Sequence, residues 1–149
     1  MMLSEHFSLE ELIRSDEALR LDVRNVPDDI EVDNLRRLCR EILEPLRAAI
    51  GLPIRVTSGY RCPLLNTVVG GSQTSAHCDG RAADIKVEGM TPRQVCERIV
   101  ALGLPFDQVI HEFGAWCHVG IAYAGAAPRG QTLTAVKAAG RTQYLQGIV

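Results

Sequence analysis

The feature that most constrains the fold is an aspartate inside an otherwise apolar strand. Residues 81–87 read RAADIKV and predict a buried strand in which Asp84 is flanked by alanine and isoleucine. Removing a lone carboxylate from water is costly unless a charged partner accompanies it. The folded chain must therefore bring a compensating group to Asp84. A divalent metal is one candidate partner, and an arginine, either Arg61 or Arg81, is the other.

Two histidines are the candidates for sharing a metal with Asp84. His77 lies seven residues before it in a loop rich in Ser and Gly, and His118 lies in a later predicted strand between Cys117 and a valine. Either histidine alone fits a structural role better than a ligand role. Together with Asp84 they form a common open zinc set, which leaves a fourth position for water.

Hydrophobic periodicity and end signals predict an α+β fold, with helices packed on a small antiparallel sheet, in one domain over residues 1–149. Capping boxes at Ser8/Glu11 and Thr91/Gln94 begin two of the helices. The first expected helix starts at residue 8, and three more cover 29–50, 63–69 and 92–102. Pro45 should kink the helix over 29–50 or start a new turn in it. The expected strands cover 54–58, 81–87, 106–112 and 116–122, the last two joined by a hairpin at 114–115. Residues 14–29 are expected to form a loop, and 132–136 either a last strand or a surface segment.

Composition excludes several classes of protein. The chain is 46% hydrophobic and 23% charged, an ordinary globular balance. A net charge of -2 and only two lysines argue against a nucleic-acid partner. No apolar run could span a bilayer, and the first residues lack the features of a signal peptide, so we expect the chain to stay in the cytoplasm as synthesised. We also expect a monomer. The five cysteines contain no CxxC pair and are expected to be reduced thiols.

Three ordered motifs resemble one peptidase family. SAHCDGRAAD at 75–84 matches the SxHxxGxAxD pattern of zinc D-Ala-D-Ala carboxypeptidases and their relatives, which include VanX-type dipeptidases and phage L-alanyl-D-glutamate endopeptidases. SGYR at 58–61 and WCH at 116–118 resemble the SGYR and WxH segments of that family. The segments FSLEEL and LRRLCREILEPLR resemble small phage and prophage members. The resemblance runs from about Phe7 to Ile121.

The resemblance implies that His77, Asp84 and His118 bind Zn²⁺ as the cofactor. It also implies that Arg61 lies near the metal and holds the substrate carbonyl or the tetrahedral oxyanion. The alternative for Arg61 is a salt bridge to Asp84 or Glu112.

The general base is the point at which the chain departs from the family. Several relatives carry an acidic residue three positions before the last zinc histidine, and here that position is Ala115. Glu112 is the nearest carboxylate and His111 adjoins it. Strand alternation places these two on opposite faces, so only one can reach the metal, and Glu112 is the favoured base.

Two further residues of the motifs, Ser75 and Trp116, have either a role in substrate binding or a structural role. The resemblance implies that Ser75 hydrogen-bonds the substrate backbone, whereas a loop or cap role fits it as well. Trp116 is either a wall of the substrate site or a core tryptophan. Asp79 and Arg81 occupy variable motif positions and are expected to be solvated, with Gly80 serving the turn.

The function implied is a zinc peptidase that hydrolyses bonds in peptidoglycan stem peptides, as a D,D-carboxypeptidase or an endopeptidase. The absence of a signal peptide suits a phage or prophage lysis enzyme that reaches the cell wall through a separate pore. One alternative is a non-catalytic zinc-stabilised module that binds the cell wall, since the hedgehog signalling domain shares this fold. A cytosolic D-Ala-D-Ala dipeptidase is a remoter option, because the chain has few residues for the loops that would close its pocket.

Overall fold

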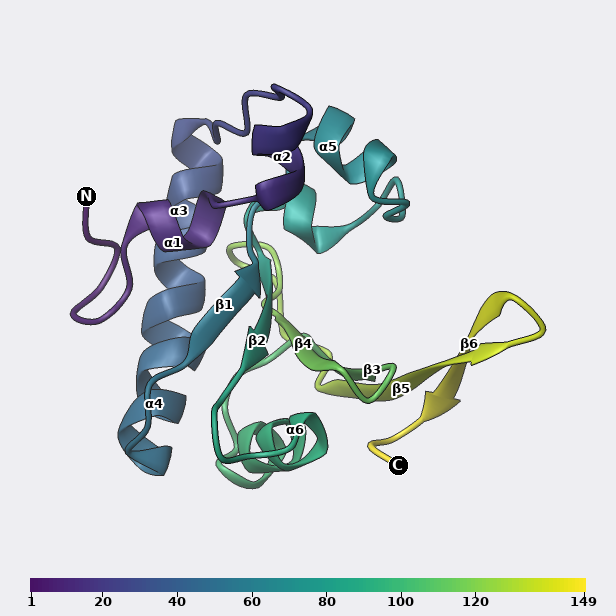
Figure 1. Cartoon of the computed structure of the whole chain (residues 1–149). Helices are drawn as coiled ribbons and strands as arrows, with labels where there is room; N and C mark the ends of the chain where they lie inside the picture. The colour runs from purple at the N-terminus through teal and green to yellow at the C-terminus, as the bar shows by residue number, and fades with distance from the viewer.

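One face of a six-stranded sheet is packed against helices, and the other face is left open (Figure 1). The computed structural model describes all 149 residues. The helices are α1 (Leu9–Ile13), α2 (Asp16–Arg20), α3 (Asp29–Leu38), the π-helical η1 (Cys39–Leu43), α4 (Glu44–Ile50), α5 (Pro63–Val68), the 3-10 helix η2 (Ala76–Asp79) and α6 (Pro92–Ala101). The strands are β1 (Arg55–Ser58), β2 (Ala82–Lys86), β3 (Gln108–Glu112), β4 (Trp116–Gly120), β5 (Gln131–Ala138) and β6 (Arg141–Gln146).

Strand alternation separates the face of the sheet that packs on the main core from an open face, which carries polar groups and a small apolar cluster of Ile110, Leu133 and Ala135. The order is β1-β2-β4-β3-β5-β6, and the core faces of β2, β4 and β3 contribute to a cluster of 22 buried apolar residues that also includes residues of α1, α3, η1, α4 and α6. Val56 of β1 packs against this cluster. Ile85, Cys117 and Val119 belong to this cluster. Because neighbours along a strand point to opposite faces, Asp84 and His118 point to the open face.

The α+β prediction is confirmed, as are both predicted capping boxes. A third box joins Asp28 and Glu31 at the start of α3. The long helix changes character before Pro45, as expected: residues 39–43 form a π-helical segment, and α4 starts at Glu44. A π-helical bulge widens the turn and relieves the clash that a proline ring makes with the preceding turn. No helix has the length and apolar content needed to cross a membrane.

The predicted loop over 14–29 is wrong in its first part, which contains α2. Ser15 caps this helix by accepting from the amide of Ala18, and Ala18 is buried. The Ser-Asp-Glu sequence at 15–17 is an ordinary helix start. A helix of five residues has too few turns to show a periodic apolar face, so the periodicity missed it.

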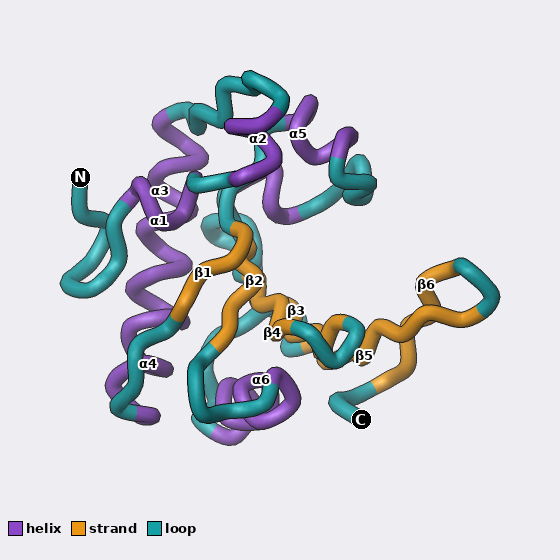
Figure 2. Tube along the Cα trace, in the orientation of Figure 1, coloured by secondary structure: helices purple, strands orange, loops and turns teal.

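The tail contains two strands where the sequence predicted at most one, and the sheet is not wholly antiparallel. β5 runs parallel to β3, and β6 pairs antiparallel with β5 across a turn in which Ala139 and Gly140 both have positive φ. All six β6 residues are exposed, so the strand lacks the polar and apolar alternation that predicts a half-buried strand. Figure 2 shows this ribbon extending away from the helices.

Candidate metal centre

Two histidines and one aspartate converge on a single point at the open face of the sheet. One ligand atom from each of His77, Asp84 and His118 lies within 4.8 Å of the other two, and all three residues are buried. His77 Nε2 is 3.4 Å and His118 Nδ1 is 3.0 Å from the same oxygen, Asp84 Oδ1. Asp84 pairs with neither Arg61 nor Arg81, so of the two partners that the sequence left open, the structure supplies the metal-ligand set.

Backbone pairing places two of these groups side by side. Asp84 of β2 and His118 of β4 are direct register partners, so their side chains leave the sheet together. His77 comes from η2, which Ser75 caps by accepting from the His77 amide at 3.2 Å. Gly80 ends η2 at a φ of 73°, and a Cβ there would lie 2.5 Å from the Glu31 carbonyl oxygen. Only glycine fits this turn, which returns the chain from His77 to β2.

A backbone carbonyl orients the His77 ring. His77 Nδ1 lies 2.7 Å from the Gly59 carbonyl oxygen, so it carries the proton and donates. Nε2 then keeps its lone pair and faces Asp84. The backbone of Gly59 packs directly against the backbone of Leu12, and a larger residue would not fit, because a Cβ at position 59 would lie 2.1 Å from the Leu12 carbonyl oxygen. The imidazole is therefore held in the tautomer that a metal ligand needs.

The electrostatics of the cluster favour a cation among its three groups. Burial alone would raise the pKa of Asp84, but its electrostatic interaction with His77 and the hydrogen bond from His118 outweigh it and hold that pKa well below its usual range. Burial likewise lowers the pKa of His118, and the Asp84 carboxylate more than reverses this, so the pKa of His118 is raised. A divalent metal can replace the proton that His118 would otherwise hold against Asp84. The donor set therefore fits a zinc ion.

Glu112 lies beside this cluster, on the same face of the sheet. Its Oε1 accepts a hydrogen bond from Trp116 Nε1 at 2.9 Å and is 3.7 Å from His118 Nδ1. Both contacts involve Oε1, which leaves Oε2 without a protein partner. His111 contacts the C-terminus instead, with Nδ1 3.2 Å from the Val149 carbonyl oxygen. The tryptophan is half-buried and contributes to the site, not to the 22-residue core.

Arg61 brings an uncommitted positive charge to the site. Its Nη2 lies 3.5 Å from Ser75 Oγ, and its Nε is buried without a hydrogen-bond partner. It forms a salt bridge to neither Asp84 nor Glu112. Its guanidinium therefore remains available to an oxygen of a bound molecule.

An open cleft of about 1240 Å³ connects these groups. It runs from α2 across the open face of the sheet to the β5–β6 ribbon. Its lining includes every residue that the sequence singled out for the site: Arg61, Ser75, His77, Asp84, Glu112, Trp116 and His118. The structure therefore brings together in one cleft seven residues that span 58 positions of the chain, from 61 to 118.

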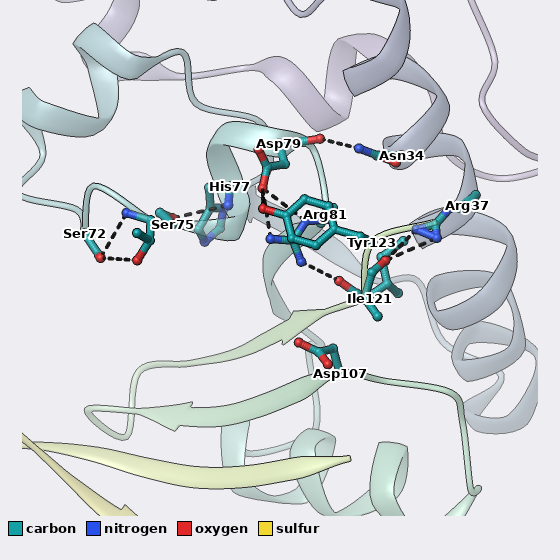
Figure 3. A network of polar contacts seen from close by, with 12 residues as sticks. Asn34, Arg37, Ser72, Ser75, His77, Asp79, Arg81, Asp107, Ile121 and Tyr123 are labelled. Carbon is teal, nitrogen blue, oxygen red and sulfur yellow. Dashed lines mark hydrogen bonds and ion pairs between the residues drawn. The ribbon is translucent and has the colours of Figure 1, made fainter. Parts of the chain in front are cut away.

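The expectation that Asp79 and Arg81 are solvated is wrong for Arg81. It is buried, donates to Asp79 Oδ2 and to the Ile121 carbonyl oxygen, and has the Tyr123 ring 3.8 Å away. Tyr123 also donates to Asp79, and Asn34 of α3 donates to the Asp79 carbonyl oxygen (Figure 3). This network fixes the loop between His77 and Asp84. Sequence reasoning missed Tyr123 and Asn34, which no local pattern distinguishes.

Two imidazoles and one carboxylate at the wall of an open cleft are typical of catalytic zinc sites, whereas structural zinc sites have four protein ligands. This arrangement is the one that metal-dependent hydrolases have. The chain belongs to the Peptidase M15 family, whose sequence model matches residues 5–120. Members of this family are zinc-dependent peptidases, which confirms the resemblance inferred from the motifs. A comparison with curated proteins gave no match.

Proposed function

We propose that this protein is a zinc metallopeptidase that hydrolyses peptide bonds in peptidoglycan stem peptides. The observation that carries the proposal is the convergence of His77, Asp84 and His118 in a cleft that also presents Glu112 and Arg61. His77 Nε2, an Asp84 carboxylate oxygen and His118 Nδ1 would hold the ion. When bound, zinc supplies Lewis acidity, which polarises a peptide carbonyl and makes water more acidic.

Arg61 would stabilise the charge that develops on the carbonyl oxygen. Amide hydrolysis turns a neutral carbonyl into an oxyanion, and a fixed cation without a competing carboxylate favours the charged form. The guanidinium of Arg61 has this character, because its only polar contact in the protein is Ser75 Oγ at 3.5 Å. Ser75 lies beside it and would hydrogen-bond the substrate backbone through its hydroxyl.

Glu112 would act as the general base and then as the general acid. Trp116 fixes Oε1 at 2.9 Å, so Oε2 is free to accept the proton of the attacking water. The protonated carboxyl then donates that proton to the departing amine nitrogen. Glu112 would thereby replace the acidic residue that relatives carry at the position of Ala115, because the β3–β4 hairpin places it directly opposite Trp116. Trp116 would also form a wall against which a substrate side chain packs.

The test is digestion of purified cell walls by the zinc-loaded protein, followed by mass spectrometry of the released peptides. We expect products that disappear with a chelator and in Glu112→Gln, while that variant still binds one zinc ion. The product masses identify the bond, and hence separate a D,D-carboxypeptidase from an endopeptidase. Stoichiometric zinc and cell-wall binding without any product would instead support the non-catalytic module, the second candidate.

The setting we propose is a phage or prophage lysis enzyme, because FSLEEL and LRRLCREILEPLR resemble segments of such members. Expression inside bacteria provides the test. We expect lysis only when a separate pore-forming protein is co-expressed, and none with the Glu112→Gln variant. Lysis without the pore would contradict this setting, and so would intact cells when active protein and pore are both present.

A further inference from the structure

A pair of basic side chains lies in the same cleft as the metal centre, toward the edge of the sheet. Arg55 of β1 and Lys86 of β2 are direct register partners, and both line the cleft. Lys86 is two residues beyond Asp84 on the same strand, so strand alternation points its side chain to the open face, as it does that of Asp84. Its register partner Arg55 points to the same face. Val56, the residue after Arg55, packs against the core on the opposite face, which agrees with this assignment.

These two cations have no partner within the protein. Neither side chain forms a hydrogen bond or an ion pair, and both are exposed. Like charges directly opposite each other on neighbouring strands are destabilising, so the pair costs the fold stability. An anion bound between the two side chains would offset that cost.

Other basic residues of the cleft are neutralised or engaged. Arg81 bonds Asp79, Arg129 bonds Asp107, and Lys137 donates to Thr142 Oγ1. The chain as a whole has a net charge of -2, so unpaired basic residues in this cleft do not reflect a general basic excess. The cations of the cleft without an acidic partner are therefore Arg55, Lys86, Arg61 and Lys137, and of these only Arg55 and Lys86 are direct register partners.

The spacing along β2 relates the pair to the reacting bond. A strand rises about 3.3 Å per residue, which places Lys86 about 7 Å along β2 from Asp84. An extended peptide lying in the cleft also advances by about 3.3 Å per residue, so two of its residues cover the distance between Asp84 and Lys86. A free carboxylate about two residues from the bond held at the metal centre would therefore reach both side chains.

We propose that Arg55 and Lys86 form a carboxylate-binding subsite that selects acidic peptides, with the carboxylate about two residues from the scissile bond. This inference rests on the proposed peptidase function and specifies in addition that the substrate carries a negative charge near the bond that is cut. Binding uses Nη and Nζ donors and a carboxylate acceptor, so replacing the carboxylate by its amide removes the charge while keeping the shape.

Isothermal titration calorimetry with two matched peptides tests the subsite. The probes are L-Ala-γ-D-Glu-L-Lys-D-Ala-D-Ala, which contains every bond the two proposed activities would cut, and the same peptide with the D-Glu α-carboxylate converted to a carboxamide. The zinc-loaded full chain carries Glu112→Gln, so that bound peptide is not consumed. We expect the acid to bind about tenfold more tightly than the amide, and Arg55→Gln/Lys86→Gln to abolish this preference without weakening amide binding. Arg98→Gln on α6 is the control, because Arg98 is exposed, unpaired and outside the cleft, and its loss changes the net charge in the same direction.

Equal binding of acid and amide by the parent protein would overturn the proposal, as would a preference that survives in the double variant. In the chain with intact Glu112, the double variant should raise KM for the acid about tenfold and leave kcat unchanged. A thermal melt shows that the double variant is folded, and removing two facing like charges should not lower its Tm. An acid preference without cleavage of this pentapeptide at any bond, and without products from cell walls, supports the subsite and rejects the peptidase function, so the two failures are separable.

Discussion

Asp84→Asn tests the metal centre through the stability of the fold, without reference to any substrate. The three ligands lie at positions 77, 84 and 118, in η2, β2 and β4, so only the folded chain brings them together. A ligand that binds only the native state adds a free energy of RT ln(1 + [L]/Kd), which is about 2.7 kcal/mol when free zinc is 100 times Kd. For a chain of 149 residues this corresponds to a rise in Tm of about 8 °C.

The asparagine keeps the shape of the side chain and removes its charge. Loss of the carboxylate should weaken zinc binding at least about 100-fold, since even indirect partners of a metal ligand are worth 10- to 100-fold. At the same free zinc concentration the ion then contributes only about 0.4 kcal/mol, and the rise in Tm shrinks to about 1 °C. The assay is a thermal melt followed by circular dichroism, with metal-free protein and with buffered free zinc.

Asp107→Asn is the matched control for this experiment. Asp107 is also a buried aspartate that lines the cleft, but it is bonded to Arg129 and belongs to no cluster of ligands. Its loss should lower Tm equally with and without zinc and keep the rise that zinc causes. A rise of the same size in Asp84→Asn and in the unaltered chain would refute the assignment of Asp84 as a ligand.

Three further predictions concern pH, thiols and a turn. The hydrogen bonds from Arg129 hold the pKa of Asp107 below its ordinary 3.8. The unaltered chain should therefore have a free energy of unfolding about 1 kcal/mol higher than Asp107→Asn above pH 5 or so, and this difference should vanish as acid protonates Asp107. Urea titrations at several pH values measure it. A loss that stayed constant down to pH 2 or so would contradict this linkage. Cys62 and Cys78 are half-buried and the other three cysteines are buried, so Ellman's reagent should titrate no more than two thiols in the folded protein and five in denaturant. Gly80→Ala should cost about 2 kcal/mol and weaken zinc binding, because its φ of 73° and the adjacent backbone leave no room for a Cβ; unchanged stability would show that the turn relaxes.

The candidate site residues were inferred from local pattern together with the resemblance to the peptidase family, and their roles stay predictions. A carboxylate in an apolar strand requires a partner whatever the rest of the fold, and the alternation of strand residues 116–118 placed Trp116 and His118 on one face. The same alternation separated Glu112 from His111. The structure brings Glu112 next to His118 and sends His111 to the C-terminus. The placement of these side chains on the faces of the strands is confirmed, because it depends on the geometry of a single strand.

Arg81 shows where local pattern failed. Its motif position is variable, so the sequence favoured a solvated side chain, but in addition to Asp79 it bonds the carbonyl oxygen of Ile121, forty residues away, and is buried. The parallel pairing of β5 with β3 and the exposed strand β6 were missed for a related reason, since their pairing partners are distant and leave no periodic trace. Pairing between distant segments is set by the whole chain.

The helix caps, the alternating strands and the glycine turn can be read from the sequence, because each follows from the conformational preferences of a few neighbouring residues. The same holds for the residue types that can bind a metal. Three facts required the folded chain: His77, Asp84 and His118 lie within 4.8 Å of one another, Arg61 has no acidic partner, and Arg55 faces Lys86. Those facts depend on strand register and helix packing, where many weak contacts between distant residues act together.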